Sequence, residues 1–249
     1  MSDAPLLHVH GLCKRFGGVR ATDGIDLRVA AGEVHALIGP NGAGKTTLVA
    51  QLAGQLAPDS GRIVFDGVDI TAWRAHQRAR RGLARSFQIT RLFGSFSVVE
   101  HIALALQAAR GSSFGAWRPL ARERALWEQA RAQLGVLGLQ DHAEASIDTL
   151  SHGQRRALEV GMAVAGAPRM VLLDEPMAGM GPDESARMEA LIAEVARRTT
   201  VLLIEHDVDA VFRLAHRVSV LVSGRVIASA APGEVRRDPQ VIAAYLGQE

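Results

Sequence analysis

Residues 39–46 bring together the residue types that hold a phosphate chain. They fit the pattern G-x-x-x-x-G-K-[ST] and read Gly39-Pro40-Asn41-Gly42-Ala43-Gly44-Lys45-Thr46. Gly42 and Gly44 let the backbone bend so that successive N–H groups point at an anion. Lys45 can reach the β- and γ-phosphates of a nucleotide, and the Thr46 hydroxyl can bind Mg²⁺. The stretch therefore predicts a site for a nucleoside triphosphate.

Two later apolar runs end in polar side chains that suit the same chemistry. Residues 170–173 lead into Asp174 and Glu175, and residues 201–204 are followed two positions later by His206. Phosphoryl transfer needs a carboxylate near Mg²⁺, and ligands of open parallel sheets bind at the carboxyl ends of the strands. We expect Asp174 on the metal side and Glu175 as the group that orients or deprotonates the attacking water. His206 could contact the γ-phosphate, although a histidine at a strand end is more often structural.

A second candidate anion site lies at residues 150–154, Leu-Ser-His-Gly-Gln. Ser151 suits the N-cap of a helix, and its hydroxyl, the free helix N–H groups and the close approach allowed by Gly153 would bind an anion. An ordinary capped helix start is the alternative interpretation. One nucleotide rarely needs two phosphate-binding helix starts from one chain, so we infer that a partner chain supplies the second.

The elements around these motifs predict an α/β fold. A buried strand over 34–38 enters the phosphate loop and a helix begins at 47, which disfavours a chance glycine-rich turn. Strands and helices alternate again after residue 170, whereas residues 90–165 are mostly helical. We therefore predict a doubly wound, mainly parallel core with a helical insertion and a small antiparallel sheet. The expected strands are 6–9, 25–29, 34–38, 62–65, 84–88, 170–173, 201–204, 218–222 and 225–228. The expected helices after the loop helix are 74–81, 97–107, 120–137, 183–196, 208–215 and 238–246.

Composition narrows the class of protein. The 249 residues are 48% hydrophobic, enough for one large domain or two small ones with a sizeable core. The formal net charge is +2 and the arginines are scattered except over 74–85, so charge alone predicts no nucleic-acid surface. One cysteine, Cys13, excludes an internal disulfide and fits a reducing compartment. We expect neither a signal peptide nor a membrane span, since no apolar run approaches the ~20 residues that a span needs.

Taken in order, the motifs resemble those of the ATP-binding cassette (ABC) ATPases of ABC transporters over essentially the whole chain. The matching features are the Walker A loop (39–46), the Q-loop glutamine (Gln88), the signature motif (150–154), Walker B with the catalytic glutamate (170–175), the switch histidine (His206) and the aromatic that stacks on adenine (Phe16). The resemblance implies a P-loop NTPase (RecA-like) fold with an N-terminal antiparallel β subdomain. Residues 1–89 and 166–249 would form the nucleotide-binding core, and residues 90–165 an inserted helical subdomain.

The resemblance also implies a role for each matching residue. The catalytic residues would be Glu175, His206, Lys45 and Gln88, and the Mg²⁺ site would use Thr46, Gln88 and Asp174. ATP would contact Phe16, Gly39, Pro40, Asn41, Gly42, Ala43, Gly44, Lys45, Thr46, Thr47, Gln88, Ser151, Gly153 and Gln154.

Finer features resemble the subgroup that serves branched-chain amino-acid importers. They are residues 84–88, 91–93, 175–180, 204–207 and 241–247. Two positions depart from the general pattern: His152 replaces the first glycine of the signature pair, and Gly181 stands where a D-loop aspartate is usual. The second departure argues against a D-loop carboxylate contact across a dimer, but not against ATP binding.

The resemblance implies two cassettes packed head to tail, with each ATP between Lys45 of one chain and Ser151 of the other. Gln88 would sense the γ-phosphate, and residues 90–97 would dock on a transmembrane subunit. The expected partners are permease subunits, a second ABC ATPase subunit, identical or similar, and indirectly a periplasmic solute-binding protein. The chain would lie on the cytoplasmic face of the inner membrane as a peripheral subunit.

Several alternatives stay open at this point. Close relatives by sequence also handle urea or other amides, and cassettes of lipid or lipopolysaccharide exporters share the E-P-x-A-G run at 175–179. A soluble cassette acting on nucleic acid or ribosomes usually has two cassettes or a long coiled-coil insertion, and this chain shows neither. A small GTPase would need an N-K-x-D motif, which is absent. The sequence names neither the transported solute nor the partner cassette.

Overall fold

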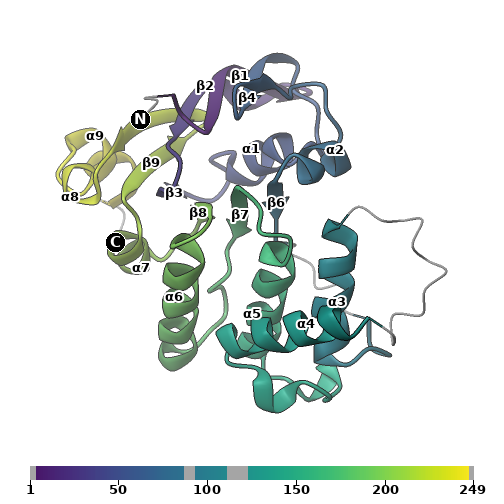
Figure 1. Cartoon of the computed structure of the whole chain (residues 1–249). Coiled ribbons are helices and arrows are strands. Elements are labelled where there is room, and N and C mark those ends of the chain that lie inside the picture. Colours follow the sequence, from purple (N-terminus) through teal and green to yellow (C-terminus); the bar gives the residue numbers. More distant parts are fainter. Residues whose placement is uncertain (1–3, 87–92, 111–122, 247–249) are drawn as a thin grey trace.

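The computed structural model describes residues 4–86, 93–110 and 123–246, which form two sheets with helices around them (Figure 1). The smaller sheet is antiparallel, with the strand order β2-β1-β4-β5. Its strands are β1 (Leu7–Phe16), β2 (Val19–Val29), β4 (Ser60–Phe65) and β5 (Val68–Asp69). The first two are much longer than the strands expected at 6–9 and 25–29, because they continue as a two-stranded hairpin whose far end is largely exposed.

The larger sheet contains six strands in the order β10-β9-β3-β8-β7-β6. All neighbours are parallel except β9 and β10, which form an antiparallel pair. Its strands are β3 (Val34–Ile38), β6 (Leu83–Arg85), β7 (Met170–Asp174), β8 (Thr200–Ile204), β9 (Arg217–Val222) and β10 (Arg225–Ala230). The predicted mainly parallel core with a small antiparallel sheet beside it is confirmed.

The helices cover both faces of the larger sheet, and α3, α4 and α5 gather at one end of the molecule (Figure 1). They are α1 (Lys45–Leu52), α2 (Ala75–Arg80), α3 (Val98–Ala109), α4 (Arg124–Val136), α5 (His152–Val164), α6 (Pro182–Ala196), α7 (Val208–Leu214), α8 (Pro232–Val235) and α9 (Pro239–Val241), with the 3₁₀ turns η3 (Gln140–His142) and η4 (Ile147–Thr149) and the π turn η5 (Ile242–Leu246). The helix expected over 238–246 is therefore a short helix followed by a π turn. The capping box predicted at the start of α3 is present: the Ser97 N–H donates to Glu100 Oε2 at 2.6 Å.

Side chains of the central strands alternate between two hydrophobic cores. Val171 and Leu173 pack with α3–α6, whereas Met170 and Leu172 pack beneath α1 and the antiparallel sheet. Burying such a side chain contributes about 1.5–3 kcal/mol. Because both faces of β7 and β8 are covered, these strands are apolar except at Asp174 and Thr200, which lie at strand ends, and they show no polar alternation.

Arg78 anchors the carboxyl end of α1, the helix that follows the phosphate loop. It is 1% exposed, and its guanidinium donates to the carbonyl oxygens of Gln51 (2.7 Å), Leu52 (2.8 Å), Thr71 (3.0 Å) and Trp73 (3.0 Å). Burial lowers its pKa to about 10. This arginine of the basic stretch is therefore a structural cap for α1, which holds the loop helix in place.

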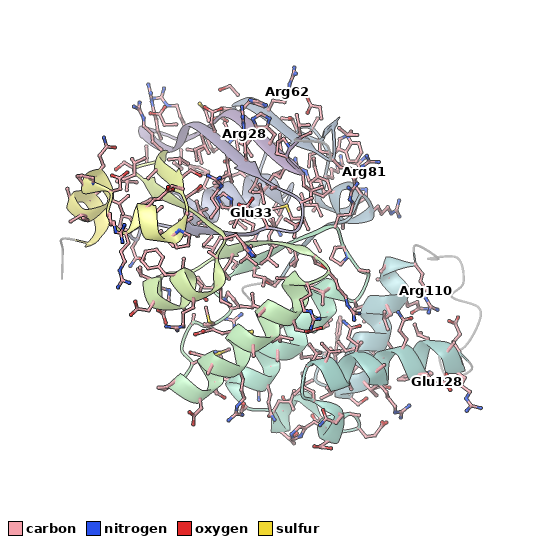
Figure 2. The ribbon with its side chains drawn as sticks, turned by 60° about the vertical axis from the view of Figure 1, so that its left-hand side comes forward. Arg28, Glu33, Arg62, Arg81, Arg110 and Glu128 are labelled. Atoms are coloured by element: carbon pink, nitrogen blue, oxygen red, sulfur yellow. The ribbon has the colours of Figure 1, made fainter. Side chains whose placement is uncertain are left out.

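Exposed charges are spread over the molecule. Figure 2 shows Arg28 and Arg62 at the end with the antiparallel sheet, and Arg110 and Glu128 at the end with α3 and α4. Exposed ion pairs such as Arg124–Glu128 contribute about 0–1 kcal/mol each. In the described part of the chain, no helix is both long and apolar enough to cross a membrane.

Candidate functional site

Three of the sequence motifs meet at one edge of the parallel sheet. Strand β8 lies between β3 and β7, and Ile204 of β8 pairs with both Leu37 and Asp174. Since the strands are parallel, the phosphate loop after β3, the carboxylates at the end of β7 and His206 after β8 all leave the sheet on the same side. This edge is where open α/β sheets bind their ligands.

The phosphate loop is held by close backbone packing. A Cβ at position 39 would overlap the carbonyl oxygen of Leu221, and one at position 44 would overlap that of Ala21. Both Gly39 and Gly44 also have φ angles in the region that favours glycine, +155° and +106°. The loop is joined to the turn between β9 and β10 by the N–H of Gly224, which donates to Ala43 O at 2.8 Å. Gly39 is needed because Leu221 of β9 lies against it, and the loop motif alone does not predict this contact.

Lys45 lies inside the loop, with 7% of its surface exposed. Its ammonium donates to the carbonyl oxygens of Gly39 at 2.6 Å and Pro40 at 3.1 Å. Burial lowers the pKa of Lys45, and the negative charges of Glu175 and Asp174 act in the opposite direction. The Lys45 ammonium is thus already positioned inside the loop, where it interacts electrostatically with the carboxylates of Glu175 and Asp174.

Asp174 is buried and paired with an arginine that the sequence did not single out. Arg85 Nη2 donates to Asp174 Oδ2 at 2.7 Å, and Arg85 also binds the side-chain oxygen of Gln55. The Asp174 side chain is 2% exposed and that of Arg85 is 12% exposed. The pairing brings the end of β6 to the end of β7.

We expect the Arg85→Ala substitution to lower the free energy of unfolding by about 3 kcal/mol, because removing one partner of a buried pair leaves the other charge uncompensated. Urea denaturation of the nucleotide-free protein measures this change in the free energy of unfolding. The double variant Arg85→Ala, Asp174→Ala serves as the control and should recover part of the loss, since no charge then stays buried. An Arg85→Ala variant that unfolds at the wild-type urea concentration would contradict the pairing.

Glu175 follows β7 in a left-handed backbone conformation. Its φ angle is +49°, which is uncommon for any residue other than glycine and costs about 1–3 kcal/mol. The Glu175 N–H donates to Ile204 O at 2.9 Å, so β8 holds the residue in this conformation. Backbone strain of this kind gathers at functional sites, and nothing in the sequence pattern predicted it.

Glu205 is a buried carboxylate that sequence reasoning missed. It is 1% exposed, and its oxygens accept the N–H of Met177 at 2.8 Å and of His206 at 3.3 Å. Burial raises the pKa of Glu205, while the two N–H groups act in the opposite direction. Glu205 therefore links the turn after Glu175 to the backbone of His206. The only signal in the sequence was its position at the end of an apolar run.

The signature segment lies at the start of α5. Ser151 is the predicted N-cap, and its Oγ accepts the N–H of Gln154 at 3.2 Å. His152, the departure from the glycine pair, contacts Ala178 O through Nε2 at 3.1 Å. Among the described residues, no hydrogen bond joins this helix start to the phosphate loop. The two predicted phosphate-binding helix starts are thus distinct within one chain.

The remaining predicted residues are those of the Q-loop, the adenine contact, the docking segment and the D-loop. Gln88 and residues 90–92 lie outside the described residues. Phe16 is 52% exposed at the end of β1, with Lys14 Nζ 5.9 Å from its ring centroid. In the expected docking segment, Phe93 and Phe96 are exposed, and their ring centroids are 5.4 Å apart. Gly181 is the N-cap of α6 and offers no carboxylate, as the sequence indicated.

The donor set at the sheet edge fits Mg²⁺. Thr46 is an exposed residue in the first turn of α1, and Asp174 has a carboxylate of which one oxygen, Oδ2, accepts a hydrogen bond from Arg85. Within the described residues there is no cluster of three or more His, Cys, Asp or Glu side chains that could hold a metal. Mg²⁺ commonly binds through one or two protein oxygens plus substrate phosphates and water, so two oxygen donors beside a phosphate loop suit it.

Comparisons with known proteins agree with this geometry. Residues 22–178 match the family model described as ABC transporter, and residues 225–249 match the model described as branched-chain amino acid ATP-binding cassette transporter. The chain is 39% identical to the high-affinity branched-chain amino acid transport ATP-binding protein BraF of Pseudomonas aeruginosa, and 38% identical to LivG of Escherichia coli, which bears the same description; each alignment covers 98% of both chains. It is also similar to a solved ATP-binding cassette of an ABC transporter in its ADP conformation, with 30% identity, a TM-score of 0.87, and coverage of 98% of this chain and 99% of that one.

Proposed function

The chain belongs to the ABC transporter family, and on that premise we propose that it is the ATP-hydrolysing subunit of an importer for branched-chain or other amino acids. The observation that supports ATP hydrolysis is the arrangement of Lys45, Asp174 and Glu175 at one sheet edge. The amino-acid substrate is supported by the names of the relatives BraF and LivG and by the match of residues 225–249.

We propose the following roles at the sheet edge. The loop N–H groups and Lys45 bind the β- and γ-phosphates, and the Phe16 ring stacks on adenine. Thr46, Asp174 and Gln88 hold Mg²⁺, which supplies positive charge to the phosphates. Glu175 accepts a proton from the attacking water, and Glu205 holds the backbone beside His206 so that the imidazole faces the γ-phosphate.

The second half of the site comes from a partner cassette. We propose that Ser151, Gly153 and Gln154 of one chain contact the γ-phosphate of the ATP held by the other. ATP would then favour the closed dimer, and hydrolysis would remove that preference. The partner is a second copy of this chain or a similar cassette.

We infer that residues 90–165 act as a helical subdomain within a single ABC domain, and that residues 1–89 and 166–249 form the nucleotide-binding core with its β subdomain. The exposed Phe93 and Phe96 would dock on a transmembrane permease subunit. Through the permeases the chain would serve a periplasmic solute-binding protein, and it would lie at the cytoplasmic face of the inner membrane.

Uptake by cells that lack this chain tests the substrate. We expect leucine, isoleucine and valine uptake to fall to background, and to be restored by the wild-type chain but not by the Glu175→Gln variant, since import needs ATP hydrolysis. Urea uptake serves as the control and should be unchanged. Loss of urea uptake with normal leucine uptake would favour the urea or amide alternative, and no change in either would favour a lipid or lipopolysaccharide exporter.

A further inference from the structure

The start of α5 is already bonded to an anion within the same chain. Glu184, in the first turn of α6, accepts the Ser151 hydroxyl at 3.0 Å and the Gly153 N–H at 3.3 Å, both on the same atom, Oε1. A hydroxyl and a helix N–H converging on one oxygen is the arrangement that such a helix start offers to a phosphate. The carboxylate of Glu184 therefore uses donors that the proposed function assigns to ATP.

The contact is close because residue 153 lacks a side chain. A Cβ there would lie 2.8 Å from Glu184 Oε1 and 2.9 Å from its carboxyl carbon. The turn before α6 is also joined to the start of α5, by the contact of His152 Nε2 with Ala178 O at 3.1 Å. The Glu184 carboxylate thus occupies the face of α5 at which a phosphate oxygen would need to arrive.

We propose that Glu184 is an in-chain substitute for the γ-phosphate of the partner's ATP, and that it must release Ser151 and Gly153 before the dimer closes. This inference rests on the proposed dimer, in which Ser151 binds that phosphate. A carboxylate and a phosphate cannot share the same two donors, and their like charges repel at this range. Glu184 therefore raises the ATP concentration that closes the dimer.

The structure offers the displaced side chain a place to go. A cavity of about 340 Å³ lies beside the contact and is lined by Ser151, Gly153, Glu184, Arg187 and Met188, among others. Arg187 is three positions after Glu184 on α6, the spacing at which opposite charges on a helix surface meet. On release, Glu184 turns toward Arg187 within this cavity.

The test is ATP-driven dimerisation of the full chain carrying Glu175→Gln. Sedimentation velocity measures the fraction of dimer at each point of a MgATP titration. Adding Glu184→Gln should lower the MgATP concentration for half-maximal dimer about tenfold, because a neutral amide competes less well with a phosphate than a charged acceptor does. The glutamine oxygen can still accept from Ser151 and Gly153, so the fold is kept.

Asp183→Asn is the matched control, because it removes an exposed carboxylate from the same helical turn and should shift the midpoint less than about twofold. Thermal unfolding and MgATP affinity of the monomer should match the parent in both variants. A dimer that forms with an unchanged or higher midpoint in Glu184→Gln would overturn this inference and leave the proposed function standing. If the Glu175→Gln parent forms no nucleotide-dependent dimer, closure between two copies of this chain fails and this inference fails with it, whereas phosphate release by the wild-type chain tests the proposed ATP hydrolysis separately.

Discussion

Replacing Glu175 by glutamine is expected to lower kcat for ATP hydrolysis about 1,000-fold while MgATP still binds. A positioned general base contributes about 10²–10⁴ in rate, and an amide cannot accept the proton of the attacking water. The substitution keeps the size of the side chain and its hydrogen-bonded backbone, since the Glu175 N–H bond to Ile204 O does not involve the carboxylate. Binding without hydrolysis should also let the ATP-bound dimer accumulate.

Steady-state phosphate release measures the loss of turnover, and sedimentation of the protein with MgATP measures the dimer. Glu128→Gln is a suitable control, since it makes the same change at an exposed carboxylate on α4 and should leave both readouts at wild-type values. If Glu175→Gln hydrolyses ATP at the wild-type rate, the general base is another group.

Replacing Lys45 by alanine is expected to weaken MgATP binding at least about 100-fold. Hydrogen bonds to charged groups are worth about 1.5–3 kcal/mol each, and every 1.4 kcal/mol is a factor of ten in affinity. The ammonium already lies inside the loop on Gly39 O and Pro40 O, so it reaches the phosphates from a preorganised position. The loss should therefore exceed that of a single surface cation.

Titration of the purified variant with a fluorescent ATP analogue and Mg²⁺ provides the measurement, with thermal unfolding to verify the fold. Arg124→Ala removes one positive charge from a side chain that is 92% exposed on α4, and should bind as the wild type does. Unaltered affinity in Lys45→Ala would show that residues 39–46 do not form the phosphate site.

Local patterns in the chain were enough to predict the fold class and most of the sheet-edge site. Three apolar runs lead into candidate site residues: the phosphate loop that begins at Gly39, the carboxylate of Asp174 and, two positions after the third run, His206. Strands covered on both faces must be apolar throughout, and strands joined by helices must be parallel, so the ends of these runs had to meet at one edge. The capped helix starts at Ser97 and Ser151 were predictable for a similar reason, because a cap depends only on residues three positions apart.

The lengths of the β1–β2 hairpin and of the last helix were predicted less well than the other elements. The β1–β2 hairpin is longer than expected, since its outer half has few buried side chains and resembles a loop in composition. The last helix is shorter than expected, since Asp238 caps only the brief helix α9 before the chain continues as a π turn. In the hairpin, pairing between β1 and β2 outweighs local preference.

The sequence alone thus determined the nucleotide loop, the order of the motifs and the mainly parallel sheet, because each follows from neighbouring residues and the periodicity of burial. Only the tertiary structure decided which partners the charged side chains bind. Arg85 with Asp174, Arg78 with the end of α1, and Glu184 with Ser151 join residues 89, 26–27 and 33 positions apart. The chain has 28 basic and 26 acidic residues, so composition allows many pairings, and only folding chooses among them by excluding water from a few. The phosphate loop is accordingly readable from the sequence, whereas the hydrogen bond of Ser151 to Glu184 at the start of α5 is visible only in the folded chain.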